Sequence, residues 1–287
     1  MARIAYVNGK FERADIAGVN IEDRGFQFAD GVYEVCLLVD GKWWDLEGHL
    51  SRLWRSLDAL KIRHPMSQGS LCAMLAKLAR LNRLQTGLVY LQVTRGAAPR
   101  NHPFPDQALP TLVVTARPFD FAASDKAART GLSVITQSDI RWGRVDIKSI
   151  SLLPNVLSKQ SAREAGADEA MLVKGDKITE GASSNMWLID DDGRLVTHPL
   201  GKEILGGITR ETTLKCAMEM QLNVDERPFT LNEAISAKEV FLTSATNLIA
   251  PVVRINKDEI SNGKPGDLTL KLRDAYIALN KATAKNM

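Results

Sequence analysis

The side chains of this sequence best suited to chemistry are those of a lysine and a glutamate. The glutamate is followed by a turn of small and hydroxyl residues. Lys148 comes after an apolar residue, and Glu180 precedes Gly181, with Ser183 and Ser184 just beyond. An amine forms a Schiff base with a carbonyl group, a carboxylate pairs with a protonated ring nitrogen, and hydroxyl groups donate to a phosphate. These residues therefore predict a site for a phosphorylated aldehyde cofactor, although each of them alone is more often an ordinary turn or surface side chain.

A second group of residues has the features of a phosphate site. Residues 206–211 read Gly-Gly-Ile-Thr-Arg-Glu and predict the start of a helix, with Thr209 as its N-cap. The free amides and the dipole of a helix N-terminus attract anions. Arg52, on a predicted helix, and Ser244, after a predicted strand at 239–242, would add donors to the same anion. The alternatives for these residues are an ordinary capped helix, a solvated arginine and a turn hydroxyl.

Composition and charge narrow the class of protein. The chain has 287 residues, of which 45% are hydrophobic, enough for a sizeable core and for two domains. A net charge of +3, without a basic run, argues against nucleic acid as a partner. The N-terminus lacks the apolar core of a signal peptide, and no apolar stretch approaches the roughly 18 residues of a membrane span. We therefore expect no contact with nucleic acid or membrane.

The cysteines and histidines indicate a reduced protein without a metal. The three cysteines, Cys36, Cys72 and Cys216, are far apart and each has apolar neighbours. This pattern favours free thiols in a cytoplasmic protein over disulfides. The four histidines show no metal-ligand spacing, so we predict no metal site.

The first third of the chain predicts hairpins followed by amphipathic helices. Asn-Gly at residues 8–9 lies between apolar runs and indicates a two-residue hairpin turn. A strand is expected over residues 32–39, and Asp45 would cap the helix that follows. Residues 87–94 and 111–115 read as buried strands.

The remainder predicts a second domain, rich in strands with inserted helices. The expected helices span residues 155–164, 210–220 and 268–279. Residues 117–127 lack periodicity and read as a linker, so we place the domains at 1–119 and 120–287. Strands and helices do not alternate regularly, and no Gly-x-Gly-x-x-Gly follows a strand. An α+β fold of two domains is therefore favoured over a dinucleotide-binding fold or a TIM barrel.

Several motifs resemble those of the fold-type IV pyridoxal-phosphate aminotransferases, over essentially the whole chain. The similarity is greatest to the D-amino-acid transaminases of that family. The matching motifs are residues 22–35, 93–96, 146–149, 179–181, 183–185 and 207–210. The resemblance implies a small N-terminal α/β domain, a larger β-barrel-like domain, a pyridoxal 5′-phosphate cofactor between them, and a homodimer.

The same resemblance gives the candidate residues their roles. Lys148 would form the internal aldimine with the cofactor and move the proton during catalysis, Glu180 would pair with the pyridine nitrogen, and Leu205 would lie against the ring. The other cofactor-binding candidates, mostly around the phosphate, are Arg52, Ser183, Ser184, Asn185, Gly207, Ile208, Thr209, Ser244, Ala245 and Thr246. Ala245 replaces a hydroxyl residue that is common in the family, which removes a hydrogen bond of about 1 kcal/mol, and Thr246 is a candidate to compensate.

A tyrosine and an Arg-x-His sequence bear on the choice of substrate. In the D-amino-acid transaminases, a tyrosine and an Arg-x-His pair from the neighbouring subunit bind the substrate α-carboxylate. Tyr33, Arg100 and His102 match that set. We therefore expect ping-pong transamination between a D-amino acid (D-alanine, D-glutamate or D-aspartate) and a 2-oxo acid such as 2-oxoglutarate or pyruvate. Within this fold the alternatives are an (R)-amine or branched-chain aminotransferase, or an enzyme like aminodeoxychorismate lyase.

Readings outside the family are a cofactor-free binding protein and a cofactor-free Schiff-base aldolase. The first predicts that Lys148 or Glu180 is lost, and the second has no use for the phosphate donors that begin at Gly207. All of these residues are present in the sequence, so the transaminase is favoured.

Overall fold

The computed structural model describes residues 3–284, and the chain divides into two compact units. The first unit holds the chain up to Asp120 together with the short segment Ile147–Ser151. The second unit holds Phe121–Asp146 and Leu152–Thr283. The segment that carries Lys148 thus belongs to the first unit, although all of residues 120–287 were expected in the second domain.

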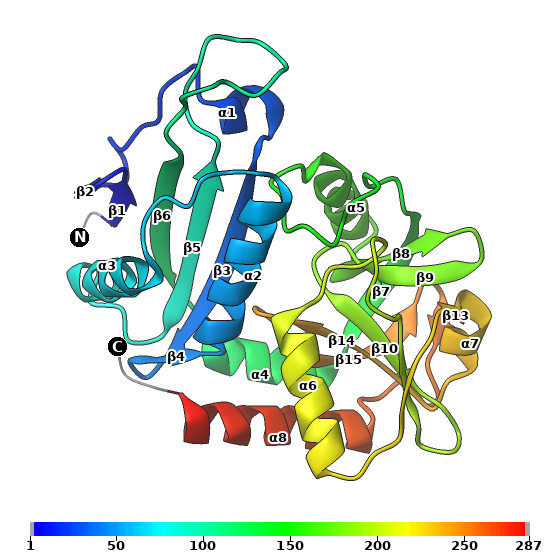
Figure 1. Cartoon of the computed structure of the whole chain (residues 1–287). Coiled ribbons are helices and arrows are strands. Elements are labelled where there is room, and N and C mark those ends of the chain that lie inside the picture. The colour runs from blue at the N-terminus through cyan, green and yellow to red at the C-terminus, as the bar shows by residue number, and fades with distance from the viewer. Residues whose placement is uncertain (1–2, 285–287) are drawn as a thin grey trace. The chain divides into compact units, whose positions relative to one another are not determined.

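The first unit is built on a six-stranded sheet in which all paired neighbours are antiparallel. The strand order is β2-β1-β6-β5-β3-β4. The strands are β1 (Ile4–Val7), β2 (Lys10–Arg13), β3 (Gly31–Val39), β4 (Lys42–Trp44), β5 (Gly87–Thr94) and β6 (Thr111–Pro118). The helices are α1 (Arg24–Phe28), α2 (Leu46–Ala59) and α3 (Gln68–Leu81), as Figure 1 shows.

Two tight turns set the register of this sheet. Asn8 and Gly9 have φ angles of 43° and 96°, and Asp40 and Gly41 have φ angles of 50° and 74°. Positive φ at both central residues is typical of a type I′ turn, whose twist matches that of the strands of a two-residue hairpin. The hairpins predicted from Asn-Gly and Asp-Gly are therefore confirmed.

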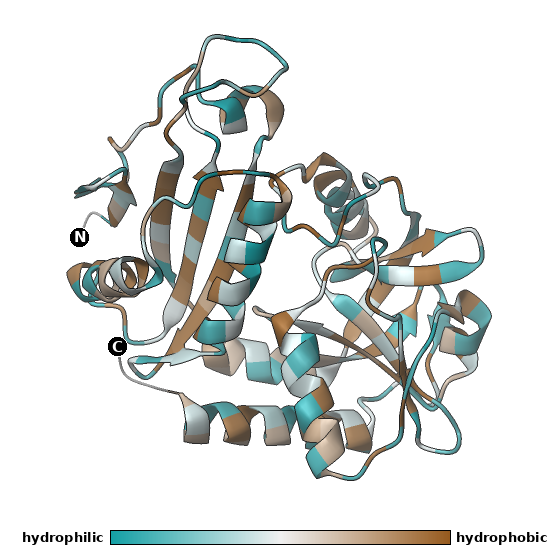
Figure 2. Cartoon of the chain, viewed as in Figure 1, coloured by the Kyte–Doolittle hydropathy of each residue, from teal (hydrophilic) through white to brown (hydrophobic). Residues whose placement is uncertain are grey.

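β3 separates the core of the first unit from the face that carries Tyr33. Val32 and Cys36 point into the core, whereas Tyr33 and Val35 are half-buried on the other face, because successive side chains of a strand alternate. α2 and α3 add leucines to this core at helical spacing, namely Leu50, Leu53, Leu57, Leu71, Leu75 and Leu78. Burying each of them stabilises the unit by about 1.5–3 kcal/mol. The outer side of α2 is mostly hydrophilic (Figure 2).

The second unit is built on a ten-stranded mixed sheet. The order is β12-β11-β10-β14-β15-β7-β8-β9-β13, and β16 pairs with β15. The strands are β7 (Leu132–Ser138), β8 (Glu169–Lys174), β9 (Lys177–Gly181), β10 (Asn185–Ile189), β11 (Leu195–Thr197), β12 (Val224–Glu226), β13 (Phe229–Thr230), β14 (Glu239–Ser244), β15 (Leu248–Ile255) and β16 (Asp258–Glu259). The helices are α4 (Phe121–Thr130), α5 (Leu153–Glu164), α6 (Ile208–Glu219), α7 (Leu231–Ser236) and α8 (Asp267–Thr283).

The centre of this second sheet is covered on both faces. All five residues of β10 are buried, and its neighbour β14 is buried except at its last residue. Trp187 and Phe241 stack across this pair with their ring centroids 5.4 Å apart. Strands buried on both faces read as continuous apolar runs, which is why both strands were predictable.

One helix lies where a linker was expected, and the N-terminal caps of two others differ from expectation. α4 begins at Phe121, so the predicted linker at 117–127 is reduced to two residues after β6. Alanines with high helix propensity form α4 without a stripe of large apolar residues. The N-cap of α6 is Gly207 rather than Thr209. Asp45 precedes α2, but its φ of 52° is not the extended backbone from which a side chain caps the next amides, and it makes no such bond.

No helix within residues 3–284 is long and apolar enough to cross a bilayer. In the same part of the chain, no three His, Cys, Asp or Glu side chains are grouped as metal ligands would be. Cys36, Cys72 and Cys216 are free thiols. Burial raises the pKa of Cys36 and of Cys72, which favours the protonated form of both thiols.

Candidate active site

Lys148 lies on a short extended segment that pairs with the start of β3 in the first unit. Its carbonyl accepts a hydrogen bond from the Tyr33 amide at 3.0 Å, and its amide donates to the Ser56 hydroxyl of α2 at 3.4 Å. Ile147, just before it, is buried in the core of the unit. The backbone of the lysine is therefore fixed, while its side chain is half-buried.

The ring of Tyr33 lies against the Lys148 amine. The distance from Nζ to the ring centroid is 4.2 Å. Tyr90 packs on Tyr33 with ring centroids 5.7 Å apart, and its hydroxyl donates to Gln92 at 2.5 Å. Burial, together with the neighbouring Tyr33, raises the pKa of Tyr90 to about 12, so its hydroxyl stays protonated. The structure thus brings together two predicted site residues, Lys148 and Tyr33.

A buried ion network that the sequence analysis missed lies on the core side of β3. Glu34 is fully buried and accepts hydrogen bonds from Arg52 Nε at 2.6 Å and Nη2 at 2.8 Å. His49 Nδ1 is 2.7 Å from the same carboxylate. Burial alone would raise the pKa of Glu34, but Arg52 and His49 hold it well below its usual range. Arg52, a predicted phosphate ligand, is thus oriented by Glu34. A glutamate within an apolar strand was the sequence signal for this pair, because a buried carboxylate requires a charged or hydrogen-bonding partner.

Arg100 and His102 lie on an exposed loop between β5 and β6 of the first unit. Both side chains contact Phe28 of α1: the Arg100 Cζ atom is 4.6 Å from the ring centroid, and the His102 ring centroid is 5.4 Å away. Within residues 3–284, neither side chain has a hydrogen-bond or ionic partner. Their polar groups therefore remain open to a ligand.

Glu180 of the second unit is buried among donors that favour its charged form. Its Oε2 atom accepts hydrogen bonds from Asn185 Nδ2 at 2.9 Å and from the Leu205 amide at 3.0 Å, and Oε1 pairs with Arg141. Asn185 also donates to the Leu205 carbonyl at 2.8 Å. The structure thus brings together three predicted site residues, Glu180, Asn185 and Leu205. Charge-assisted hydrogen bonds of this kind keep a carboxylate ionised.

Arg141 is the residue of this second site that the sequence analysis missed. Its side chain is 4% exposed and forms a second ion pair with Asp139 at 2.7 Å, and Asp139 accepts a hydrogen bond from the Thr179 hydroxyl at 2.7 Å. Burial alone would lower the pKa of Arg141, but Asp139 and Glu180 raise it. The sequence Asp-Ile-Arg at 139–141, shortly before Lys148, was the available clue.

The two serines predicted near the phosphate lie beside a buried carboxylate. Ser183 Oγ donates to Glu169 Oε2 at 2.7 Å, and Ser184 Oγ lies 3.5 Å from the same oxygen. Glu169 is fully buried. A hydroxyl has one proton to donate, and a phosphate oxygen accepts. Ser183 is therefore engaged with Glu169 rather than open to a phosphate.

The start of α6 packs against Asn185. A side chain on Gly207 would place its Cβ atom 2.1 Å from Asn185 Oδ1, so this close approach requires glycine. Ile208 and Thr209, which follow, are buried. Gly207 provides no side-chain cap, so the first amides of α6 keep the open arrangement that binds anions.

Ser244 ends β14 and begins the turn into β15. Its Oγ atom accepts a hydrogen bond from the Asn247 amide at 3.0 Å and lies 3.4 Å from Thr246 Oγ1. Either hydroxyl can donate in the contact between Ser244 and Thr246, so one of the two protons stays available for another acceptor. β14 pairs with β10 so that the residue before Ser244 lies opposite Asn185. The strand pair thus connects this turn to the network around Glu180.

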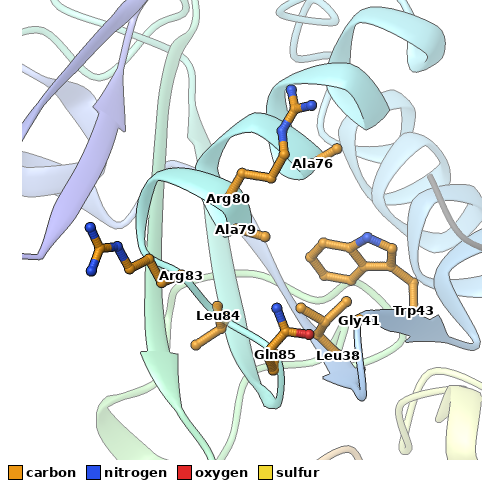
Figure 3. Close-up of a pocket in the computed structure, with 9 residues that line it drawn as sticks. All are labelled: Leu38, Gly41, Trp43, Ala76, Ala79, Arg80, Arg83, Leu84 and Gln85. Atoms are coloured by element: carbon orange, nitrogen blue, oxygen red, sulfur yellow. The ribbon is translucent and has the colours of Figure 1, made fainter.

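A cavity of about 390 Å³ lies elsewhere in the first unit, between the β3–β4 hairpin and α3. Its lining residues are Leu38, Gly41, Trp43, Ala76, Ala79, Arg80, Arg83, Leu84 and Gln85. Figure 3 shows the Trp43 ring turned into the cavity, whereas the guanidinium groups of Arg80 and Arg83 point away from it. None of these residues is a predicted site residue, so the cavity does not belong to the site around Lys148.

The chain is similar to known aminotransferases over most of its length. The family model for amino-transferase class IV matches residues 31–255. The chain is 41% identical over 268 residues to the D-alanine aminotransferase of Bacillus licheniformis, which covers 93% of this chain and 94% of that protein. It is also 41% identical over 272 residues to the D-alanine aminotransferase of Listeria monocytogenes serotype 4b, with 94% of both chains covered.

Solved structures confirm the predicted two-domain fold-type IV architecture. The branched-chain amino acid aminotransferase of Escherichia coli superposes with a TM-score of 0.90 at 22% identity, over 100% of this chain and 97% of that one. The branched-chain aminotransferase of the archaeon Thermoproteus uzoniensis, solved with norvaline, superposes with a TM-score of 0.87 at 22% identity, over 98% and 96% of the two chains. At this identity the likeness shows the fold alone. The family match and the relatives at 41% identity carry the assignment further: the chain belongs to the class IV aminotransferases.

Proposed function

We propose that this protein is a pyridoxal-phosphate-dependent transaminase that moves the amino group of a D-amino acid to a 2-oxo acid. The observation that carries the proposal is the buried Glu180 carboxylate, bonded to Arg141 and Asn185, in a chain 41% identical to a D-alanine aminotransferase. A carboxylate kept in its charged form is the partner that a protonated pyridine nitrogen requires.

The donors and acceptors of the chain fit this cofactor. Lys148 offers an amine for the aldehyde, Glu180 a carboxylate for the ring nitrogen, and Leu205 an apolar side chain for the ring. When bound, the cofactor takes up the electron pair that the substrate α-carbon releases. The residues of the protein bind and orient the cofactor and the substrate, and they move a proton. Lys148 Nζ, once neutral, takes the proton from the α-carbon. The Tyr33 ring beside it keeps water from one side of the amine.

The groups proposed to hold the phosphate are the amides of Gly207, Ile208 and Thr209, the hydroxyls of Ser244 and Thr246, and the guanidinium of Arg52. Asn185 is better suited to support Glu180, because its amide protons go to Glu180 and Leu205. Ser183 likewise supports the turn through Glu169. Ser184 remains a candidate phosphate ligand, because its contact with that carboxylate is long, at 3.5 Å. Ala245 offers its backbone amide to the phosphate.

D-Alanine, D-glutamate and D-aspartate are the proposed amino donors, with 2-oxoglutarate or pyruvate as acceptor. The relatives at 41% identity are D-alanine aminotransferases. Arg100 and His102, with open polar groups, and Tyr33, beside Lys148, would bind the α-carboxylate. We propose that Arg100 and His102 act in the site of the neighbouring subunit, as the resemblance implies.

The proposal includes a homodimer. α5 exposes Leu153, Val156 and Leu157 by 68%, 57% and 52%. Their i, i+3 and i+4 spacing puts them on one face of the helix, and a contiguous apolar face of this kind marks an interaction surface. A second copy of the chain would cover it.

The two compact units are proposed to be the small and the large domain. The contact boundary after Asp120 lies one residue from the expected end at 119, with the Lys148 segment added to the first unit. A cytoplasmic location is proposed from the three free thiols, which suit a reducing compartment.

Absorbance spectroscopy tests the cofactor assignment. Purified protein with added pyridoxal phosphate should show the visible band of a protonated Schiff base, and Lys148→Ala should lack it. Lys126→Ala, at an exposed lysine of α4, is the matched control and should keep the band. A wild-type protein without the band would rule out the proposal.

A coupled assay tests the substrate. D-Alanine, L-alanine, a branched-chain L-amino acid and (R)-1-phenylethylamine are each offered with 2-oxoglutarate. Turnover of D-alanine that falls in Arg100→Ala supports the proposal. Preferential turnover of a branched-chain L-amino acid or of the amine would favour the alternatives within the fold.

A further inference from the structure

Two buried arginines and a shared aspartate lie beneath the loop that carries Arg100 and His102. Arg24, 4% exposed, donates from Nε to Asp30 at 2.8 Å. Arg95, 7% exposed, donates to both carboxylate oxygens of Asp30, at 2.7 and 2.9 Å. We call Arg24, Asp30 and Arg95 the arginine cluster. It sets two positive charges against one carboxylate, so each guanidinium needs further acceptors to be stable in a buried position.

Arg24 finds those acceptors on the loop itself. Its Nη1 atom donates to the carbonyl of Asn101 at 2.5 Å and to that of Pro103 at 3.4 Å, and its Nη2 atom donates to the carbonyl of His102 at 3.1 Å. One guanidinium thus holds three successive carbonyl groups. Charge-assisted bonds to a planar fork restrict the backbone dihedrals there, and with them the direction in which the His102 side chain leaves the loop.

Arg95 fixes the cluster on its other side. It donates to the carbonyl groups of Leu60 and Lys61, both at 2.9 Å. Its Cζ atom lies 3.6 Å from the centroid of the Phe104 ring, a cation–π contact with the far side of the same loop. The arginine cluster therefore ties the loop to the end of α2.

α1 connects the cluster to the side chains of the loop. Phe28, its last residue, contacts the Cζ atoms of Arg24 at 4.8 Å and Arg100 at 4.6 Å, and the ring of His102 at 5.4 Å. Asp23 caps α1 and accepts a hydrogen bond from the Thr94 hydroxyl at 2.9 Å, so the helix is attached to the end of β5. The backbone and the side chains of the loop are thus both seated on one fixed helix.

We infer that Arg24 is a positioning residue for the substrate carboxylate: by holding the carbonyl groups of residues 101–103, it fixes the places of Arg100 and His102. This inference rests on the proposed function, in which Arg100 and His102 of the loop bind the substrate carboxylate. Four of its hydrogen bonds go to Asp30 and the loop carbonyls. Arg24 therefore acts through the loop and does not itself bind the substrate.

The test combines loop mobility with substrate binding in the full-length, cofactor-loaded enzyme. In Arg24→Gln, hydrogen–deuterium exchange of residues 97–110 should become at least about tenfold faster, because the charged fork is lost. The half-saturating concentration of D-alanine, measured from the cofactor absorbance in the first half-reaction, should rise roughly ten- to a hundredfold. The limiting rate and the affinity for the cofactor should change much less. Arg24→Lys should lie between, because an ammonium group keeps the charge without the fork.

Arg80→Gln is the matched control, at an exposed arginine of α3, and should change neither quantity. Unchanged exchange of the loop in Arg24→Gln would overturn the anchoring. Faster exchange with an unchanged half-saturating concentration would overturn its effect on substrate. A wild-type enzyme that does not turn over D-alanine would count against the proposed function instead, and the exchange result would still decide the anchoring. If Arg24→Gln does not fold, Arg24→Lys carries the same comparisons.

Discussion

At the scale of single residues, Arg141 is a charged partner of the buried Glu180 carboxylate. Without that arginine, the buried carboxylate keeps the neutral donors of Asn185 and Leu205 but loses a charged partner. Its ionised form is then destabilised, and so is its pairing with a protonated ring nitrogen. Arg141→Met should weaken binding of pyridoxal phosphate at least about tenfold, roughly 1.4 kcal/mol, measured by quenching of tryptophan fluorescence. Arg144→Met, at an arginine that is 41% exposed and pairs with Asp146, is the control and should bind the cofactor normally.

Asp139 makes the same network sensitive to acid. Burial alone would raise the pKa of Asp139, but the hydrogen bonds and charge of Arg141, with the Thr179 hydroxyl, lower it. A carboxyl group with a lowered pKa in the folded state stabilises that state above its unfolded pKa, about 3.9, and loses this contribution as the pH falls further. Asp139→Asn should therefore have a lower urea midpoint of unfolding than the wild type at pH 7. Near pH 3 the difference between the two midpoints should be smaller. An equal difference at both pH values would contradict this account.

Candidate residues for the site could be chosen from residue types, but the partners of the charged residues could not be predicted. Lys148 and Glu180 stood out because of the small and hydroxyl residues near them in sequence. Arg141 and Glu180 pair although they are 39 positions apart in the sequence, and Ser183 and Glu169 are 14 positions apart. Such pairs depend on strand register, which no local pattern gives. For this reason the roles proposed here for Ser183 and Asn185 differ from the phosphate contacts expected from the sequence.

At the scale of elements, Gly96 controls the loop that follows β5. Its φ is 98°, and a Cβ atom there would lie 1.8 Å from the Leu109 carbonyl oxygen. Gly96→Ala should therefore combine backbone strain with a backbone clash and lower stability by more than about 2 kcal/mol. Gly9→Ala is the matched control, because Gly9 has a φ of 96° with no atom within 4 Å of the added Cβ. Gly9→Ala should lower the free energy of unfolding only by the backbone strain, about 1 kcal/mol. Chemical unfolding of both variants measures these losses. Equal losses in the two variants would remove the clash from the explanation.

Elements defined by local chemistry were predicted well, and those defined by packing were not. The Asn-Gly and Asp-Gly hairpins and the helices α5, α6 and α8 follow from turn residues and periodicity. α4 has a single buried residue, Ala128, so its sequence lacks the apolar stripe of a helix. The N-cap of α6 is Gly207 rather than the expected Thr209, and the close contact of Gly207 with Asn185 depends on packing that no local pattern gives.

At the scale of the whole molecule, the chain order conceals which unit holds Lys148. Its segment, Ile147–Ser151, interrupts the second unit in sequence and pairs with β3 of the first. A boundary read from composition divides a chain once, so it assigned Lys148 to the second domain. The pairing with the Tyr33 amide shows why the lysine belongs with the first unit: its backbone is an added partner at the start of β3.

The proposed homodimer should depend on the exposed face of α5. Leu153, Val156 and Leu157 together gain several kcal/mol if a second copy covers them, at about 1.5–3 kcal/mol for each fully buried aliphatic side chain. A charge in that position would be buried without a partner, at a cost that exceeds this gain. Val156→Glu should therefore convert a dimer into a monomer in sedimentation velocity. It should also lower D-alanine turnover, because Arg100 and His102 would lose the neighbouring site in which we propose that they act.

Met218→Glu, at a side chain of α6 that is 73% exposed, is the control for the added charge and should remain dimeric and active. The two readouts separate the claims within this prediction. A monomeric Val156→Glu variant that keeps full turnover would show that each subunit completes its own site. A Val156→Glu variant that stays dimeric would show that the subunits meet elsewhere, since an unpaired glutamate is not tolerated at the centre of an apolar contact.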